Sequence, residues 1–194
     1  MKHVLVVAHP NPSSFTHGIA HAYGEAVAAL GHDHAARDLY AIGFDPRLPA
    51  EEIPGHKHYS VRDDVIAERE ILRTADIFAF FYPLWINSPP AILKGYFDRV
   101  FGFGFAYGRK AEGNVPLLTP RKMISFTSSG APQEWLMSTG SWDAMRTLFD
   151  QHFAGVCGLT VVDHVHFGRI VPGMRPDVFA RHVETTRAAV VRNF

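Results

Sequence analysis

The first thirty residues contain a short apolar segment, a loop rich in proline and hydroxyl side chains, and an amphipathic segment. Val4–Ala8 is a continuous apolar run dominated by valine, which is typical of a parallel strand buried on both faces. Apolar residues then recur at spacings of three and four from Ile19 to Leu30, and Gly31 suits a helix C-terminus. A buried strand that leads through a loop into a helix is the first unit of an alternating α/β fold.

The same alternation continues to the end of the chain. Further strands are predicted at 35–40, 77–81, 123–127 and 159–165, and further helices at 65–73, 91–101, 141–153 and 176–191. Such alternation predicts a parallel sheet with helices on both faces, because parallel strands need right-handed crossovers. We therefore expect one domain over 1–194, a three-layer α/β sandwich with a five-stranded parallel sheet of order 2-1-3-4-5. In that order the loops after the first, third and fourth strands meet at one edge, where ligands bind.

Composition narrows the function classes. The chain carries 19 Lys and Arg against 19 Asp and Glu, so no nucleic-acid partner is indicated. The most apolar later stretch, 77–86, contains Pro83 and falls short of the roughly 18 apolar residues of a membrane span, so we do not expect an integral membrane protein. Val4–Ala8 is too short for a secretory signal. The single cysteine, Cys157, fits a reducing compartment, and the cytoplasm is expected.

The first loop, His9–Thr16, leads directly into a helix. A helix N-terminus presents unpaired N–H groups and about half a positive charge, so Ser14 and Thr16 can complete a site for a phosphate. The loop has neither glycine-rich signature of a dinucleotide or nucleoside triphosphate site, which favours a mononucleotide phosphate. The alternative is that Ser14 or Thr16 only caps the helix.

Two further loops carry groups suited to a flat aromatic ligand. In Pro83–Asn87, Trp85 can border such a ligand and Asn87 can hydrogen-bond its edge, although a tryptophan is more often part of a core. The small residues of Thr127–Gly130 let backbone N–H groups approach a ligand and stabilise negative charge on it; the alternative is an ordinary polar turn. Together the three loops predict a flavin nucleotide site.

Several longer motifs, each different, follow one another along the chain. They are His9 with Ser14–Phe15, Asp38–Arg47, Pro90–Val100, Phe105–Tyr107, Thr127–Gly130 and Cys157–Gly158. This series resembles the NAD(P)H quinone reductase family, the DT-diaphorase-like flavoproteins. The resemblance implies a flavodoxin-like fold, a flavin cofactor, NAD(P)H as co-substrate, a quinone as acceptor, and a homodimer with its active sites at the subunit interface.

The resemblance also implies roles for individual residues. His9, Phe15 and Thr16 would contact the phosphate side of the flavin nucleotide, while the other two loops hold the isoalloxazine ring. The complete set of expected cofactor-binding residues is His9, Ser14, Phe15, Thr16, Pro83, Leu84, Trp85, Ile86, Asn87, Thr127, Ser128, Ser129 and Gly130. Phe105 and Tyr107 would cover the partner's flavin, or else pack locally in the core. Because the flavin performs the hydride transfer, no catalytic side chain is predicted.

Two departures from the family limit what can be carried over. Ile86–Asn87 stand where the mammalian members have a Trp-Phe pair, and Trp135 and Ser141 stand where they have a tyrosine and a histidine near the flavin. A Tyr-His proton relay is therefore not expected, and Trp135 is predicted only to contact the substrate. The acidic and arginine pair at the adenine end of FAD-binding relatives has no match around 169–177, which favours FMN over FAD.

Histidines and the cysteine offer weaker signals. His32, His56 and His164 each begin a His-x-His pair, a spacing that places two imidazoles on one face of an extended segment. Without further ligands at recognisable intervals no metal site is predicted, and solvated surface histidines are expected. Cys157 has no evident activating neighbour and is expected to be a packed thiol.

Three functions are compatible with these features. The leading hypothesis is an enzyme that reduces quinones, with azo or nitroaromatic reduction as side activities. The second is a flavodoxin-like electron carrier, although such carriers gain from an acidic docking face and this chain has zero net charge. The third is a flavin-binding regulatory partner of a membrane transporter.

The missing Tyr-His relay leads to a first prediction. Trp135→Ala should retain flavin and lose less than about a hundredfold in turnover, since no acid–base side chain is removed. Steady-state kinetics on the purified variant, with its flavin content determined by absorbance, measure both quantities. A larger loss with flavin still bound would contradict the expectation.

Overall fold

Five parallel strands form the central sheet, and two short strands form a separate hairpin. The computed structural model describes residues 1–111 and 113–194, and within them the strands are β1 Lys2–Val7, β2 Asp33–Asp38, β3 Ile77–Pro83, β4 Tyr107–Lys110, β5 Gly113–Pro116, β6 Lys122–Ser128 and β7 Thr160–Phe167. The sheet order is β2-β1-β3-β6-β7, with every pair parallel. Since β6 and β7 are the fourth and fifth strands of this sheet, the predicted order 2-1-3-4-5 is confirmed.

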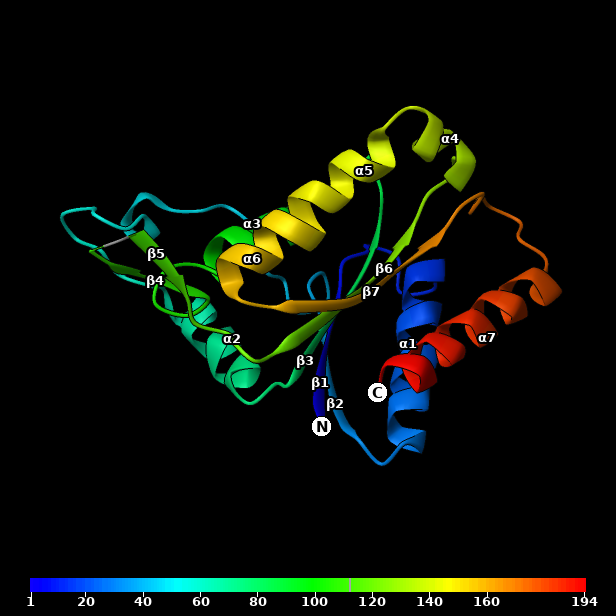
Figure 1. Cartoon of the computed structure of the whole chain (residues 1–194), viewed down its shortest axis with the longest axis horizontal. Coiled ribbons are helices and arrows are strands. Elements are labelled where there is room, and N and C mark those ends of the chain that lie inside the picture. Colours follow the sequence, from blue (N-terminus) through cyan, green and yellow to red (C-terminus); the bar gives the residue numbers. More distant parts are fainter. Residues whose placement is uncertain (112) are drawn as a thin grey trace.

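Helices cover both faces of the sheet, as predicted. They are α1 Phe15–Ala29, α2 Asp63–Arg73, α3 Ala91–Arg99, α4 Gln133–Ser138, α5 Ser141–Arg146, α6 Ala154–Cys157 and α7 Pro176–Asn193, together with a 3-10 turn η1 Ala50–Glu52 and a π-helical segment η2 Thr147–Phe153. Figure 1 shows α1 and α7 on one side of the sheet and α2, α3, α5 and α6 on the other. The three-layer α/β sandwich is therefore confirmed.

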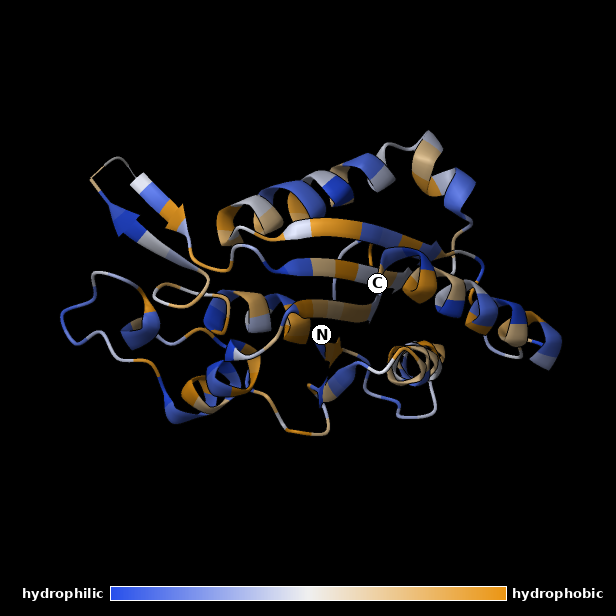
Figure 2. Cartoon of the chain, turned by 60° about the horizontal axis from the view of Figure 1, so that its bottom comes forward, coloured by the Kyte–Doolittle hydropathy of each residue, from blue (hydrophilic) through white to orange (hydrophobic). Residues whose placement is uncertain are grey.

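The alternation of side chains along β3 explains the two cores. Phe78, Phe80 and Tyr82 point into the core beneath α2, α3 and α6, while Ile77, Ala79 and Phe81 point into the core beneath α1 and α7. All seven residues of β3 are buried. Hydrophobic residues recur along the strands in the middle of the molecule, and the β4–β5 hairpin projects from them (Figure 2). A strand buried on both faces needs an apolar side chain at nearly every position, which is what the sequence provides.

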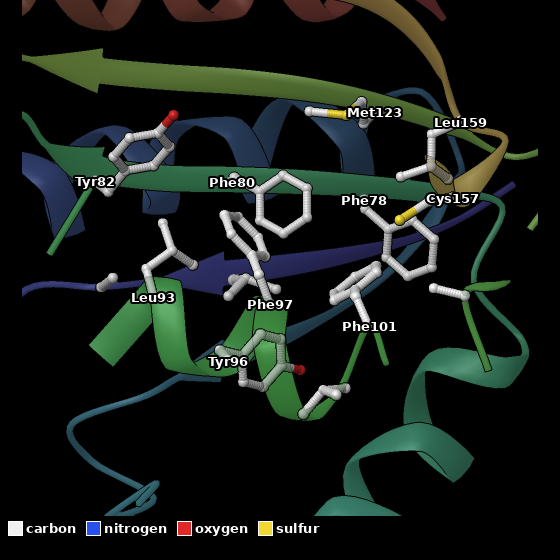
Figure 3. Close-up of a cluster of buried hydrophobic side chains, with 14 of the residues drawn as sticks. Phe78, Phe80, Tyr82, Leu93, Tyr96, Phe97, Phe101, Met123, Cys157 and Leu159 are labelled. Carbon is white, nitrogen blue, oxygen red and sulfur yellow. The ribbon is translucent and has the colours of Figure 1, made fainter. Parts of the chain in front are cut away.

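Aromatic side chains fill the core on the α3 side (Figure 3). The ring of Phe97 lies 5.2 Å from Phe80 and 4.4 Å from Phe153, so α3, β3 and η2 meet around one residue. Cys157 lies in the same core, and its burial raises the pKa of the thiol to about 12. The prediction of a packed thiol is confirmed.

Three segments differ from their predicted structure. The second strand covers 33–38 rather than 35–40, because the chain turns after Asp38. The helix predicted over 141–153 continues to Cys157 and changes to π-helical geometry on the way, which periodicity alone does not reveal. The β4–β5 hairpin was not predicted, since strands of four residues that contain Gly108 or Gly113 carry little apolar alternation.

The long connection between β2 and α2 is fastened to α3. The Arg99 side chain is 1% exposed and forms ion pairs with Glu52 and Asp64. Four residues earlier on the helix, Gly95 lies so close to the connection that a Cβ at this position would be 2.2 Å from the carbonyl oxygen of Pro46. Gly95 is therefore required for close packing, although glycine is a poor helix former.

This close contact predicts opposite effects for two similar substitutions. Gly95→Ala should lower the free energy of unfolding by about 2 kcal/mol or more, because the added methyl overlaps backbone. Gly155→Ala, in α6 with open space around it, should raise the free energy of unfolding by up to about 1 kcal/mol. Urea unfolding curves of both variants measure these changes. Equal effects would show that Pro46 moves away without cost.

Candidate functional site

The loops after β1, β3 and β6 meet at the carboxyl edge of the sheet through a hydrogen bond and a contact between aromatic rings. The backbone N–H of Leu84 donates to the carbonyl of Ser128 over 2.7 Å, which links the second loop to the third. The Asn87 side-chain amide donates to Ser141 Oγ over 3.2 Å and ties the second loop to α5. The rings of His9 and Trp85 lie 5.8 Å apart and connect the first loop with the second. The convergence expected from the strand order is confirmed.

The first loop is shaped by its own hydrogen bonds. Asn11 accepts the backbone N–H of Ser13 through Oδ1, and its own N–H donates to Nδ1 of His9. Ser14 is the N-cap of α1 and accepts the backbone N–H of His17. Burial lowers the pKa of His9 and favours its neutral form. Ser14 therefore caps the helix, and the N–H groups of the first turn still point toward the end of the helix. A contact between Ser14 and a phosphate stays a prediction.

The side chains of Phe15 and Thr16 turn away from the open end of the loop. Thr16 is buried, and the Phe15 ring packs against Phe167, Phe179 and His182 between α1 and α7. In this conformation these residues present their backbone N–H groups, not their side chains, to an anion. A contact between Phe15 or Thr16 and a cofactor phosphate stays a prediction.

The second loop makes a tight turn in a conformation that is unfavourable for its residues. Trp85 and Ser88 bond to each other through both backbone groups, and the two residues between them have positive φ, 50° for Ile86 and 54° for Asn87. A β-branched residue rarely adopts such an angle, and this strain typically marks a functional site. Ile86 is fully exposed and Trp85 is 45% exposed. The alternative in which Trp85 fills the core is wrong, because the turn holds its ring at the surface.

The hydroxyl groups of the third loop point toward β7. Thr127, Ser128 and Ser129 are buried, and Thr127 Oγ1 lies 2.9 Å from ring nitrogens of both His164 and His166. Ser129 donates its backbone N–H to Phe167. The loop is therefore held rigidly by β7, and a ligand at this edge would meet its backbone.

The fold agrees with the comparisons to known proteins. Residues 1–190 match the family described as having a flavodoxin-like fold. The chain belongs to this family. It is 32% identical over 171 residues to an uncharacterized NAD(P)H oxidoreductase of Haemophilus influenzae, a match that covers 88% of this chain and 85% of that protein. It is 28% identical to NAD(P)H dehydrogenase [quinone] 1 of Cavia porcellus, over 91% of this chain and 73% of the relative.

The fold of this chain is also similar to that of a solved structure. The NAD(P)H:quinone oxidoreductase from Methanothermobacter marburgensis superposes with a TM-score of 0.86 at 31% identity, covering 98% of this chain and 95% of the other. The similarity to the quinone reductases inferred from sequence motifs is thereby confirmed.

Three predicted residues lie outside the cluster of loops. Phe105 is buried against Phe101, with the guanidinium of Arg69 5.7 Å from its ring, as in the core-packing alternative. Tyr107 begins β4 and packs near Phe103. Trp135 lies on α4, just after the third loop, and is 48% exposed. Contacts of these side chains with a partner subunit or a substrate stay predictions.

The residues behind the third loop were not predicted. His164 and His166 were expected at the surface, but α5 and η2 cover them, and the side chain of His164 is 2% exposed. Asp150 of η2 accepts a hydrogen bond from His164 Nδ1 over 2.8 Å. The His-x-His spacing on a strand was the available signal, since it places both rings on one face.

Neither membrane-spanning helices nor metal-binding clusters occur in the described part of the chain. Within 1–111 and 113–194, no helix has both the length and the apolar character needed to cross a membrane. The same residues contain no group of three or more His, Cys, Asp or Glu side chains arranged to bind a metal ion.

The strained turn predicts that stability and binding change in opposite directions. Ile86→Asn should raise the free energy of unfolding of the flavin-free protein by about 1 kcal/mol, because asparagine tolerates positive φ and the exposed isoleucine loses no burial. The same change should weaken flavin binding, since it removes an apolar contact from the loop. Urea unfolding and flavin fluorescence titration test the two effects.

Ile66→Asn is the matched control, because Ile66 is also exposed but lies in helix α2. It should leave flavin binding unchanged and should not raise stability. Unchanged flavin affinity in Ile86→Asn would show that the turn does not belong to the flavin site.

Proposed function

We propose that this protein is an NAD(P)H-dependent flavin oxidoreductase that reduces quinones by two-electron hydride transfer. The observation that carries the proposal is the joining of three loops at one sheet edge, with a helix N-terminus on one side and a strained, exposed turn on the other. A relative named as an NAD(P)H oxidoreductase and a solved NAD(P)H:quinone oxidoreductase support it, at 32% and 31% identity over most of the chain.

The residues present fit a flavin nucleotide. The N-terminus of α1 suits the phosphate, because the Ser14 cap leaves the first-turn N–H groups available to an anion. Trp85 and Ile86 offer apolar surface to a flat ring system, and the backbone of Thr127–Gly130 borders the same edge. A bound flavin would supply the hydride chemistry, accepting a hydride from NAD(P)H and passing two electrons to a quinone. The protein's own part is to bind, orient and cover the reactants.

FMN is the proposed form of the cofactor. Within 169–177, Asp177 and Arg175 form an ion pair over 2.8 Å and are exposed, and Arg169 lies 3.7 Å from Glu134. Asp177 and Arg175 are therefore engaged with each other and not directed at an adenine. A cavity of about 960 Å³ does adjoin the first loop, between Pro12–His17 and Ile170–Met174, so the alternative cofactor FAD has room. Chromatography of the released nucleotide separates the two outcomes.

The remaining properties are proposed on the same basis. We expect each chain to form one domain and two chains to form a homodimer. Residues of the partner would complete each site, and Phe105 and Tyr107 would lie on the side toward the partner. A cytoplasmic location stays a prediction from cysteine usage. The apolar turn around Ile86 and the half-exposed Trp135 favour aromatic acceptors, so azo or nitroaromatic compounds are proposed as secondary substrates.

The electron-carrier alternative makes a different prediction for turnover. An enzyme of the proposed type, loaded with flavin, should oxidise NADH or NADPH with a simple quinone in steady state and with no other protein present. Absorbance of the nicotinamide measures this reaction. A flavin-loaded protein that transfers electrons only when a separate reductase is added would be a carrier, and one that co-purifies with a transporter and shows no turnover would be a regulatory partner.

A further inference from the structure

Five side chains form a continuous chain of hydrogen bonds behind the third loop. Asp150 lies on η2, His164 and His166 on β7, Thr127 on β6, and Ser129 in the loop itself. The successive distances are 2.8 Å from Asp150 Oδ2 to His164 Nδ1, 2.9 Å from His164 Nε2 to Thr127 Oγ1, 2.9 Å from Thr127 Oγ1 to His166 Nδ1, 3.0 Å from His166 Nε2 to Ser129 Oγ, and 2.8 Å from Ser129 Oγ to the carbonyl oxygen of Ala131.

The chain is shielded from solvent at its inner end. The side chains of His164 and Asp150 are 2% and 4% exposed. Trp142 of α5 lies over both imidazoles, with ring centroids 5.1 and 5.3 Å away. A proton held there exchanges with bulk water only through the hydrogen-bond chain or by local opening of the protein.

The charged and titratable groups around the pair come from every neighbouring element. Arg146 of α5 lies 3.2 Å from Asp150, Tyr82 of β3 faces the same carboxylate, and Asp163 of β7 accepts the backbone N–H of His164 and pairs with Arg192 of α7. Burial, and then the charge of Asp150, raise the pKa of Tyr82, so its phenol stays neutral.

His166 also stays neutral near pH 7. Burial, and then the neighbouring His164, lower the pKa of His166 to about 4. Each hydrogen bond of the chain can therefore be assigned a donor, because a neutral imidazole carries one N–H and each hydroxyl carries one O–H.

With Asp150 ionised beside Arg146, counting hydrogens from the outer end gives one arrangement in which every contact is a hydrogen bond. The carbonyl of Ala131 only accepts, so Ser129 donates to it, and Ser129 Oγ must accept from His166 Nε2–H. Nδ1 of neutral His166 then accepts from Thr127, whose Oγ1 must accept from His164 Nε2–H. His164 also donates Nδ1–H to Asp150 and is therefore doubly protonated. Without that proton, the five contacts share one hydrogen too few, and two polar atoms 2.8 to 3.0 Å apart would have no hydrogen between them.

We propose that Asp150 and His164 store one proton and that the hydrogen-bond chain delivers it to the third loop through Ser129 Oγ. The inference rests on the proposed function, because reduction of a quinone by NAD(P)H consumes one proton besides the hydride. In the balanced reaction, NAD(P)H, a quinone and one H⁺ give NAD(P)⁺ and a hydroquinone.

Delivery moves one hydrogen at each position and leaves the total balanced. Ser129 turns its hydroxyl from the Ala131 carbonyl to the acceptor, gives up its hydrogen there and takes the Nε2 hydrogen of His166. His166 takes the hydroxyl hydrogen of Thr127 at Nδ1, and Thr127 takes the Nε2 hydrogen of His164. His164 ends neutral with its Nδ1–H still donated to Asp150. Asp150 and His164 act through the chain as positioning residues for the proton, and the pair is reprotonated from solvent after each turnover.

Nitrogen NMR of the histidine rings tests the stored proton directly, with no variant and no activity required. In the ¹⁵N-histidine-labelled wild-type protein at pH 7, both ring nitrogens of His164 should have the shifts of an imidazolium, and His166 should be the neutral Nε2–H tautomer. The signals are assigned by their loss in His164→Gln and His166→Gln. A neutral His164, or a His166 that carries its proton on Nδ1, would overturn the proposal.

Kinetics test the delivery. His164→Gln keeps a donor and an acceptor in place but cannot hold the extra proton, so kcat should fall about tenfold or more at pH 8, less at pH 6, with KM changed less than twofold. Asp150→Asn should behave alike. The exposed neighbour His152→Gln is the control and should match the wild type at both pH values. Equal pH profiles in wild type and His164→Gln would overturn delivery.

Different outcomes contradict the quinone reductase function and the proton store. A flavin-loaded wild-type protein without quinone turnover would contradict the proposed function and the delivery step with it, while the NMR spectrum still decides whether the proton is stored. Normal turnover with a neutral His164 would retain the proposed function and eliminate the proton store.

Discussion

The burial of β3 on both faces is the constraint on which the site depends. All seven of its residues are buried, and it pairs with β1 on one side and β6 on the other. Because the pairing is parallel, all three strands end at the same edge. The chain leaves β1 toward α1 on one face and β3 toward α3 on the opposite face (Figure 1), so this edge is the topological switch point of the sheet.

The loops at this edge are held in place by the protein itself. The Leu84–Ser128 and Asn87–Ser141 hydrogen bonds fix the strained turn, and β7 holds the hydroxyls of the third loop. A site that is already ordered loses less conformational entropy on binding. The positive φ at Ile86 is the corresponding cost in stability, borne by a residue whose side chain is fully exposed.

The sequence predicts the fold well, because the spacing of apolar residues indicates which segments are helices and which are buried strands. Val4–Ala8 and Ile77–Phe81 could be assigned as buried strands from composition alone, and the strand–helix alternation indicated a parallel sheet with helices on both faces. The order 2-1-3-4-5 was a choice among the orders that such a sheet allows. The positions of the three loops followed in turn. Their motifs also indicated the family, since the resemblance covers much of the chain.

The side-chain arrangement of the site could not be predicted, because it depends on tertiary contacts. The sequence is compatible with Ser14 as a helix cap and as a phosphate ligand, and the structure was needed to show that Ser14 caps α1. The positive φ of Ile86 contradicts local preference and is imposed by the pairing of Trp85 with Ser88. The burial of His164 needs the π-helical turn that brings Asp150 inward, and neither feature has a local signal. Similarly, the contact of Gly95 with Pro46 joins residues far apart in sequence.

The absorbance spectrum of the purified protein, followed by release of its chromophore, tests the central claim most directly. Three preorganised loops at the end of a flavodoxin-like sheet should bind one flavin per chain, so the spectrum should show the two visible bands of an oxidised flavin. The released nucleotide should elute as FMN. A colourless protein that cannot be reconstituted with either FMN or FAD would contradict the account.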